Sequence, residues 1–195
     1  MAKLEDFVLT NDGFAFRGRQ YSDNDVAHIS LDLIHADVRA SFVSTGGVDL
    51  ARLEIRLAGG ETLTVTSKSG FAPLALYFRD KPEERMGVRQ AYETLAARTF
   101  KTRLNPFIEQ VQRLGYFEYD QARFYPDGRL FIKGKQLNAA DIEWSRTAAY
   151  VYANPKKPTL ADKLSKGWDG GPHIYVDTDH DVLFFLLHRF FGIKW

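Results

Sequence analysis

The sequence predicts an α+β protein, mainly β, that is built from two similar units. Three observations lead to this prediction: one stretch of sequence recurs at a fixed offset, apolar residues alternate with polar ones in both halves, and each half ends in a stretch with helical spacing. With 195 residues, the chain is long enough for two units of roughly 100 residues, a common domain size.

The repeat relates residues 16–20 to 132–136, and residues 25–26 to 141–142, at an offset of 116 residues throughout. A glycine, a glutamine and an aspartate are shared, and most of the other aligned positions carry close substitutions such as lysine for arginine. The Asp-Gly pair at 12–13 faces another at 127–128 with a slip of one residue. A duplicated unit explains this self-similarity.

The first half reads as strands followed by one long helix. Period-two alternation with glycine-containing turns predicts hairpins and strands over residues 7–9, 14–16, 29–33, 53–57 and 62–66. Spacings of three and four then predict a helix over 88–114. Pro106 should kink or divide this helix, and Gly115 should end it.

The second half repeats that order with shorter elements. Strands are expected at 142–144, 148–152 and 173–176, and a long loop at 154–172. The apolar stretch 182–191 reads as a terminal helix, with Asp181 as its N-cap and Gly192 just after its end.

Composition limits the classes of protein. The apolar fraction of 45% and the charged fraction of 26% are ordinary for a soluble globular chain. A net charge of +1 argues against a general nucleic-acid binder, which usually carries a basic excess. The chain has no cysteine, which excludes disulfides and a cysteine nucleophile. Charges near the N-terminus and short apolar runs lead us to expect a cytoplasmic protein without a signal peptide or transmembrane segment.

The order of elements resembles the pleckstrin-homology-like (PH-like) superfold in the divergent form found in bacterial proteins. The order is an antiparallel strand set, a Gly-Arg/Lys-Gln turn, an Asp-Val/Ile strand start, a glycine-rich hairpin and a closing helix, at 4–115 and again at 116–195. The resemblance implies two bent antiparallel sheets or partly open barrels, each closed by a C-terminal helix. It also implies a binding platform for lipid headgroups, peptides or proteins.

The repeated basic pairs are the first candidate site. Arg17 with Arg19, and Lys133 with Lys135, are each two residues apart, so on a strand each pair would face one way. With glycine between them, two cations could hold a phosphate group. The alternative is a solvated strand face.

The second candidate site is the basic loop. It holds Lys156, Lys157, Lys163 and Lys166 together with Trp168. Lysines near an anionic surface favour binding, and tryptophan favours the headgroup region, so this loop would suit a membrane, a phosphate-bearing ligand or an acidic protein. A solvated loop is the alternative.

The third candidate is a run of histidines and aspartates near the C-terminus: His173, Asp177, Asp179, His180, Asp181 and His188. These residue types can bind a divalent metal, but their spacing matches no known metal motif. The aspartates are also explained by the start of a helix, so we expect no metal and no cofactor.

The fourth candidate is the terminal helix, which is apolar on nearly all sides. It could plug the second unit, or a surplus apolar face could form a homodimer or a partner interface. The residues assigned to such an interface are Phe185, Phe190, Phe191 and Trp195.

Sequence motifs for catalysis are missing. The chain contains no P-loop, no Gly-x-Ser-x-Gly elbow and no His-Glu-x-x-His. The leading hypothesis is therefore a non-enzymatic binding or scaffold protein with a protein partner or a homodimer. A peripheral membrane or phosphate-headgroup binder and a small metal-dependent hydrolase are the alternatives.

Overall fold

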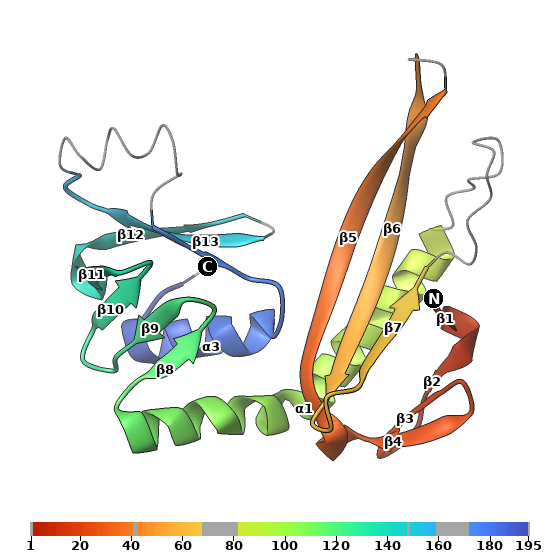
Figure 1. Ribbon diagram of the computed structural model, residues 1–195, viewed down its shortest axis with the longest axis horizontal. Helices are drawn as coiled ribbons and strands as arrows, with labels where there is room; N and C mark the ends of the chain where they lie inside the picture. Colours follow the sequence, from red (N-terminus) through yellow and green to blue (C-terminus); the bar gives the residue numbers. More distant parts are fainter. Residues whose placement is uncertain (1, 41–42, 68–81, 148, 159–171, 195) are drawn as a thin grey trace. The chain divides into compact units, whose positions relative to one another are not determined.

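The computed structural model describes residues 2–40, 43–67, 82–147, 149–158 and 172–194. The chain divides into two compact units, residues 1–103 and 104–195. The described residues form four sheets and two helices, so the protein is α+β and mainly β, as predicted (Figure 1). None of the four sheets closes into a barrel within the described part of the chain.

The first unit contains two sheets. One is antiparallel, in the order β2-β3-β4, and the other has the order β1-β7-β6-β5. In the second sheet β1 pairs with β7 in parallel, and all other neighbours are antiparallel. The elements are β1 (Ala2–Lys3), η1 (Leu4–Asp6), β2 (Phe7–Leu9), β3 (Gly13–Phe16), β4 (Arg19–Ser22), η2 (Asp23–Asp25), β5 (Val26–Ala40), β6 (Val43–Leu57) and β7 (Thr62–Thr66).

Alternation in β6 and β7 builds the core of the first unit. Leu53 and Ile55 are fully buried and pair with Val65 and Leu63 of β7, while the intervening Glu54 is half-buried. The predicted hairpin with its glycine turn is therefore confirmed. The first part of helix α1 (Pro82–Leu114) packs on this core with Val88, Ala91, Leu95 and Ala96.

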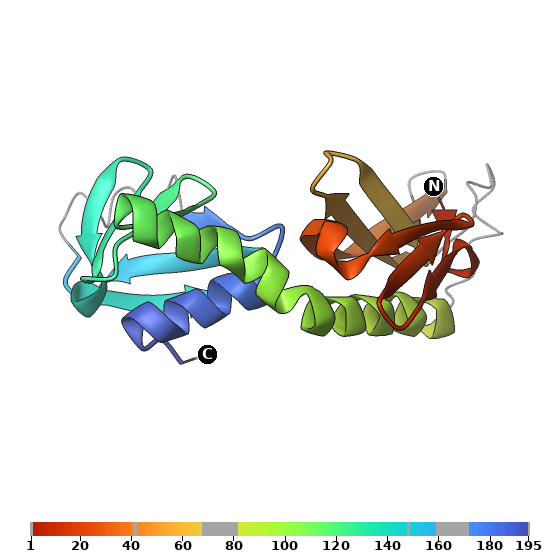
Figure 2. The same ribbon diagram turned by 90° about the horizontal axis from the view of Figure 1, so that it is seen from below.

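Helix α1 continues past its proline. It is a single helix of 33 residues that includes Pro106 (Figure 2), so of the two predicted alternatives, a kink or a division into two helices, the division does not occur. Proline removes one backbone hydrogen bond there, and the other bonds of the helix hold it together. The predicted end is confirmed: Gly115 takes a left-handed φ of 77°, and its N–H donates to the carbonyl of Val111 at 2.9 Å.

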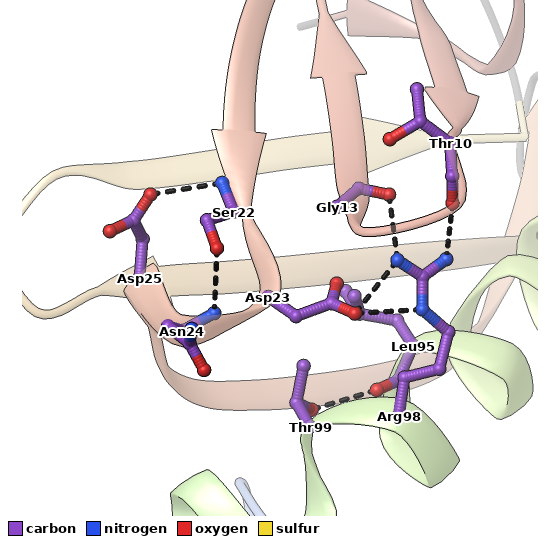
Figure 3. A network of polar contacts seen from close by, with 9 residues as sticks. All are labelled: Thr10, Gly13, Ser22, Asp23, Asn24, Asp25, Leu95, Arg98 and Thr99. Atoms are coloured by element: carbon purple, nitrogen blue, oxygen red, sulfur yellow. Dashed lines mark hydrogen bonds and ion pairs between the residues drawn. The ribbon is translucent and has the colours of Figure 1, made fainter.

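Arg98 of α1 donates hydrogen bonds to the β2–β3 turn and to η2 in the first unit. Figure 3 shows Arg98 donating to the Asp23 carboxylate at 2.8 Å, to the Thr10 carbonyl at 2.7 Å and to the Gly13 carbonyl at 3.1 Å. The β2–β3 turn and η2 are thus held by one side chain. The side chains of Arg98 and Asp23 are 23% and 20% exposed.

The second unit again contains two sheets, followed by the terminal helix. The sheet orders are β11-β10-β9-β8 and β12-β13-β14, and all pairs are antiparallel. The elements are β8 (Phe117–Tyr119), β9 (Ala122–Phe124), β10 (Arg129–Ile132), β11 (Lys135–Asn138), η4 (Ala139–Asp141), β12 (Ile142–Arg146), β13 (Tyr150–Pro155), β14 (His173–Tyr175) and α3 (His180–Phe191). Asn154 and Pro155 lie in β13, so the predicted loop begins later than expected, and Ala148 lies outside the described residues.

The repeat recurs in the structure at the same offset. β3, β4 and η2 correspond to β10, β11 and η4 with identical lengths, and β5 and β12 begin at equivalent residues. Backbone contacts correspond too: Asp23 N–H donates to the Asp12 carbonyl at 3.2 Å, and Ala139 N–H to the Gly128 carbonyl at 2.8 Å. Ser22 caps η2 as its counterpart Asn138 caps η4.

The terminal helix begins two residues before the predicted start. Its N-cap is Asp179, in a left-handed conformation with φ 49°, and the predicted cap Asp181 lies in the first turn. Gly192 ends the helix with φ 66°, as predicted. The helix lies beneath the sheet of β12 and β13 in Figure 1, and it buries Val182, Leu183, Leu186 and Leu187.

Candidate functional site

The first residue of each basic pair lies in a turn, which corrects its predicted placement on a strand. The second residues, Arg19 and Lys135, are the first residues of β4 and β11. Arg17-Gly18 joins β3 to β4, and Lys133-Gly134 joins β10 to β11. Their φ angles are 51° and 79° in the first turn and 49° and 78° in the second. Two residues with positive φ between paired strands form a type I′ hairpin turn. This turn explains the glycine at its second position, because glycine adopts a positive φ without the steric strain that a side chain would bring.

In the first unit, Arg19 is exposed but already pairs with neighbouring side chains on the surface. Its guanidinium lies 3.3 Å from the carboxylate of Glu61 and 5.0 Å from the ring centroid of Tyr21. Arg17 is exposed and lies over the ring of Phe16. These two cations therefore do not converge on a common anion site as two neighbours on one strand would.

In the second unit, Lys133 of the turn contacts His173, a residue of the histidine-aspartate run. The Lys133 ammonium lies 2.7 Å from Nε2 of His173 on β14. Because an ammonium only donates, this contact is a hydrogen bond in the tautomer that leaves Nε2 as the acceptor. The structure thus joins a residue of the basic pair to one of the histidine-aspartate run.

Three tyrosines surround this contact. Tyr150 lies 5.2 Å from the His173 ring and 5.4 Å from Tyr175, and Tyr152 lies 5.8 Å from His173, between ring centroids. Together with Lys133, these rings form a surface that we call the aromatic–lysine face: Lys133, Tyr150, Tyr152, His173 and Tyr175.

This face is the outer side of the three-stranded sheet. Along β13 and β14 the tyrosines and the histidine alternate with Val151, Ala153 and Ile174, which are fully buried. Tyr175 is 46% exposed. Sequence reasoning missed the face, although its signal was present: two aromatic pairs at spacing two, each around a buried residue, on strands that became neighbours.

Among the described residues, β14 is an edge strand of the same sheet, and its edge lies beside the face. Val176 N–H donates to the Ala149 carbonyl and Ala153 N–H donates to the Pro172 carbonyl, both at 2.9 Å. In an antiparallel pair these directions alternate, so the backbone groups of the intervening Tyr175 point away from β13. There the Tyr175 N–H donates to the Asp120 carboxylate at 3.2 Å.

The β8–β9 turn that carries Asp120 is fixed by its neighbour. Tyr119 is buried, and its hydroxyl donates to the Thr178 carbonyl. Burial raises the pKa of the Tyr119 hydroxyl, and the nearby Asp177 and Asp179 act in the same direction. Asp120 has a φ of 52°, a conformation that aspartate tolerates better than most residues.

The basic loop lies largely outside the described residues. Lys163, Lys166 and Trp168 are among the residues that the structure does not describe. Lys156 is exposed and donates to the Ala140 carbonyl at 2.7 Å, and Lys157 is exposed as well. Lys135 is also exposed, at the start of β11.

The other two histidines of the C-terminal run, His180 and His188, lie close to backbone carbonyls. His180 lies 3.0 Å from the Val176 carbonyl through Nε2, and His188 lies 2.9 Å from the Ile193 carbonyl through Nδ1. Within the described ranges, no group of three or more histidine or acidic side chains gathers where a metal could bind.

Two of the proposed interface residues pack inside the second unit. Phe190 lies 5.8 Å from the buried Phe117 ring, and Phe191 lies 6.0 Å from the buried Phe124. Phe185 is 41% exposed, and Trp195 lies outside the described residues.

A small hollow lies near the start of α3. Its volume is about 350 Å³, and it is lined by Arg146, Thr147, Val176, His180 and Phe184. The guanidinium of Arg146 lies 5.2 Å from the ring centroid of Phe184, so these two lining residues already contact each other. We therefore place the candidate site on the aromatic–lysine face.

No protein-family model, curated protein or solved structure matched this chain. In the part of the chain that the structure describes, no helix is both long and apolar enough to cross a membrane.

Proposed function

We propose that the chain is a non-enzymatic binding protein made of two PH-like units, and that it holds a protein partner through the aromatic–lysine face. The two-unit proposal is supported by the matching order of strands and turns at an offset of 116 residues. The cytoplasm remains our proposed compartment, on the grounds of composition.

The observation that carries the proposal is the ring cluster around Lys133. Four aromatic rings and an ammonium group share the outer side of a sheet whose inner side is core. Tyrosine combines a large apolar surface with a hydroxyl, which is why it is enriched in protein interfaces. A lysine at the border adds a preference for an anionic group.

The proposal leaves two other partners to be tested. A homodimer would use Phe185, the α3 ring that is exposed to a similar degree as Tyr175. An anionic lipid surface would use the exposed Lys156 and Lys157.

A binding selection tests the three possibilities. Short random peptides displayed on phage would be selected on the purified full-length chain, and the affinities of the enriched peptides measured by fluorescence anisotropy. Tyr175→Ser should weaken binding about tenfold, roughly 1.4 kcal/mol, whereas the matched Phe185→Ser should leave it nearly unchanged.

The charged part of the face has an equally close control. Lys133→Asn removes the ammonium and places asparagine before Gly134, an order that type I′ turns favour. Arg17→Asn makes the same change in the equivalent turn of the first unit. Loss of binding in both turn variants alike, or no enriched peptide at all, would contradict the proposal. Salt-sensitive binding to phosphatidylserine vesicles that Lys156→Gln abolishes would favour the lipid partner instead.

A further inference from the structure

We propose that the partner is an extended peptide that adds to the outer edge of β14 as a further strand and places an acidic residue beside Lys133. This inference rests on the proposed function, and it specifies the shape and charge of the ligand.

The first support is the direction of the backbone groups in β14. The N–H groups of Val176 and Ala153 bond across the β13–β14 pair, which directs the intervening N–H and carbonyl of Tyr175 outward. An outward row of this kind is the template that a peptide uses when it extends a sheet.

The second support comes from the first unit, where a strand covers the corresponding edge. β1 pairs in parallel with β7, joining Ala2 to Val65 and Lys3 to Thr66. Val65 faces Leu53 of β6 in the way that Ile174 faces Val151 of β13, so β14 is the counterpart of β7. Among the residues described in the second unit, β13 is the one strand that pairs with β14.

The third support is the group that now occupies this edge. The carboxylate of Asp120 accepts from the Tyr175 N–H at 3.2 Å, where a neighbouring strand would offer a carbonyl oxygen. Asp120 is exposed, so it can turn into solvent when a peptide carbonyl replaces it. The exchange keeps the Tyr175 donor satisfied, which avoids the penalty of an unpaired backbone group.

The aromatic–lysine face explains how such a strand would gain affinity. Side chains on a strand alternate between faces, and neighbouring strands lie about 4.8 Å apart. Every second side chain of the added strand would therefore lie against the rings of His173 and Tyr175. A carboxylate in this row can reach Lys133, which already contacts His173. A nucleic acid fits less well, because Asp120 lies beside Tyr175 and the chain has a net charge of only +1.

An N-methyl scan of an enriched peptide tests the inference with the full-length chain. Methylation removes one backbone N–H at a time. If the peptide pairs with β14, methyl groups at alternate positions should weaken binding tenfold or more, while those at the positions between should have little effect. The intervening positions are the internal control.

Two further measurements test the contacts on each side. Asp120→Ala should strengthen binding several-fold, because the peptide no longer competes with the carboxylate for Tyr175. Changing the acidic residue of the peptide to its amide should weaken binding to the wild-type chain but not to Lys133→Asn, in a double-mutant cycle.

The outcomes separate this inference from the proposed function. Sensitivity to Tyr175→Ser with no alternation in the scan would show that the face binds a partner but that β14 accepts no strand, which overturns the inference alone. Enriched peptides whose affinity is unchanged by both Tyr175→Ser and Lys133→Asn would overturn the inference and the proposed function together. Tighter binding of a single-stranded oligothymidine than of any peptide would show that the proposed class of partner is wrong.

Discussion

Arg98→Gln should destabilise the first unit much more than Arg89→Gln, although both arginines lie on α1 and both have a carboxylate partner. Arg98 donates to Asp23, Thr10 and Gly13 at 2.7–3.1 Å, and its side chain is 23% exposed. Arg89 lies 2.9 Å from Glu93, and those two side chains are 64% and 57% exposed. Glutamine and arginine have similar helix propensities, so the substitution tests the contacts.

The expected magnitudes follow from burial. Hydrogen bonds to charged groups contribute about 1.5–3 kcal/mol each, but bonds from one side chain are not additive and partial exposure weakens them. We therefore expect Arg98→Gln to cost about 2–4 kcal/mol. Part of this cost arises at Asp23: its Oδ2 would lose Arg98, and among the described residues its buried Oδ1 has no hydrogen-bond partner to compensate. An exposed pair four residues apart on a helix contributes only about 0.3–0.5 kcal/mol, which sets the expectation for Arg89→Gln.

Urea denaturation followed by far-UV circular dichroism measures both variants. Tryptophan fluorescence is the companion signal for the second unit, because all three tryptophans lie after residue 103. A cycle with Asp23→Asn isolates the ion pair and should give a coupling of about 1–2 kcal/mol. Equal losses for Arg98→Gln and Arg89→Gln, or no coupling to Asp23, would refute the reasoning from burial.

Three other expectations concern single residues. Gly13→Ala would place Cβ 1.9 Å from the Tyr21 carbonyl oxygen, so thermal or urea denaturation should show a loss of at least about 2 kcal/mol. At Gly134 the added Cβ meets no atom within 4 Å, so the loss from Gly134→Ala should come only from the positive φ of 78° and amount to about 1–2 kcal/mol. A larger loss than at Gly13 would contradict this ranking. Because burial raises the pKa of Tyr119, the unfolded chain releases this proton at a lower pH than the folded chain does. The free energy of unfolding should therefore fall above about pH 10, by at most about 1.4 kcal/mol per pH unit. Tyr119→Phe should remove this pH dependence in denaturation curves, and an unchanged dependence would contradict the assignment.

Local patterns in the sequence predicted much of the fold. Alternation around Gly59-Gly60 was sufficient for the β6–β7 hairpin, and glycine marked the ends of α1 and α3. These features depend on neighbours in the chain, so a sequence read in order reveals them. The predicted strand placement of Arg17 failed because two successive positive φ angles are a property of the turn, and arginine gives no local sign of them.

The candidate site could be predicted only in part. Lys133 and His173 are 40 residues apart, and their contact depends on how β14 pairs with β13. The contact of Asp120 with Tyr175 spans 55 residues and depends on the placement of the β8–β9 turn. Sequence periodicity indicates which face of a strand is buried, but it does not determine which strands become neighbours.

The matching boundaries at residues 13–26 and 129–142 make this stretch a natural cassette for grafting. Both copies run through a strand, a type I′ turn, a second strand and a capped 3₁₀ turn, so a transplanted copy would enter and leave the host sheet at equivalent backbone positions. The copy from the second unit carries Ala139 where the first has Asp23. A chimera would therefore accept the backbone of the donor and lose the carboxylate that Arg98 holds, so its stability would separate the backbone scaffold that the units share from the side-chain contacts that are particular to each.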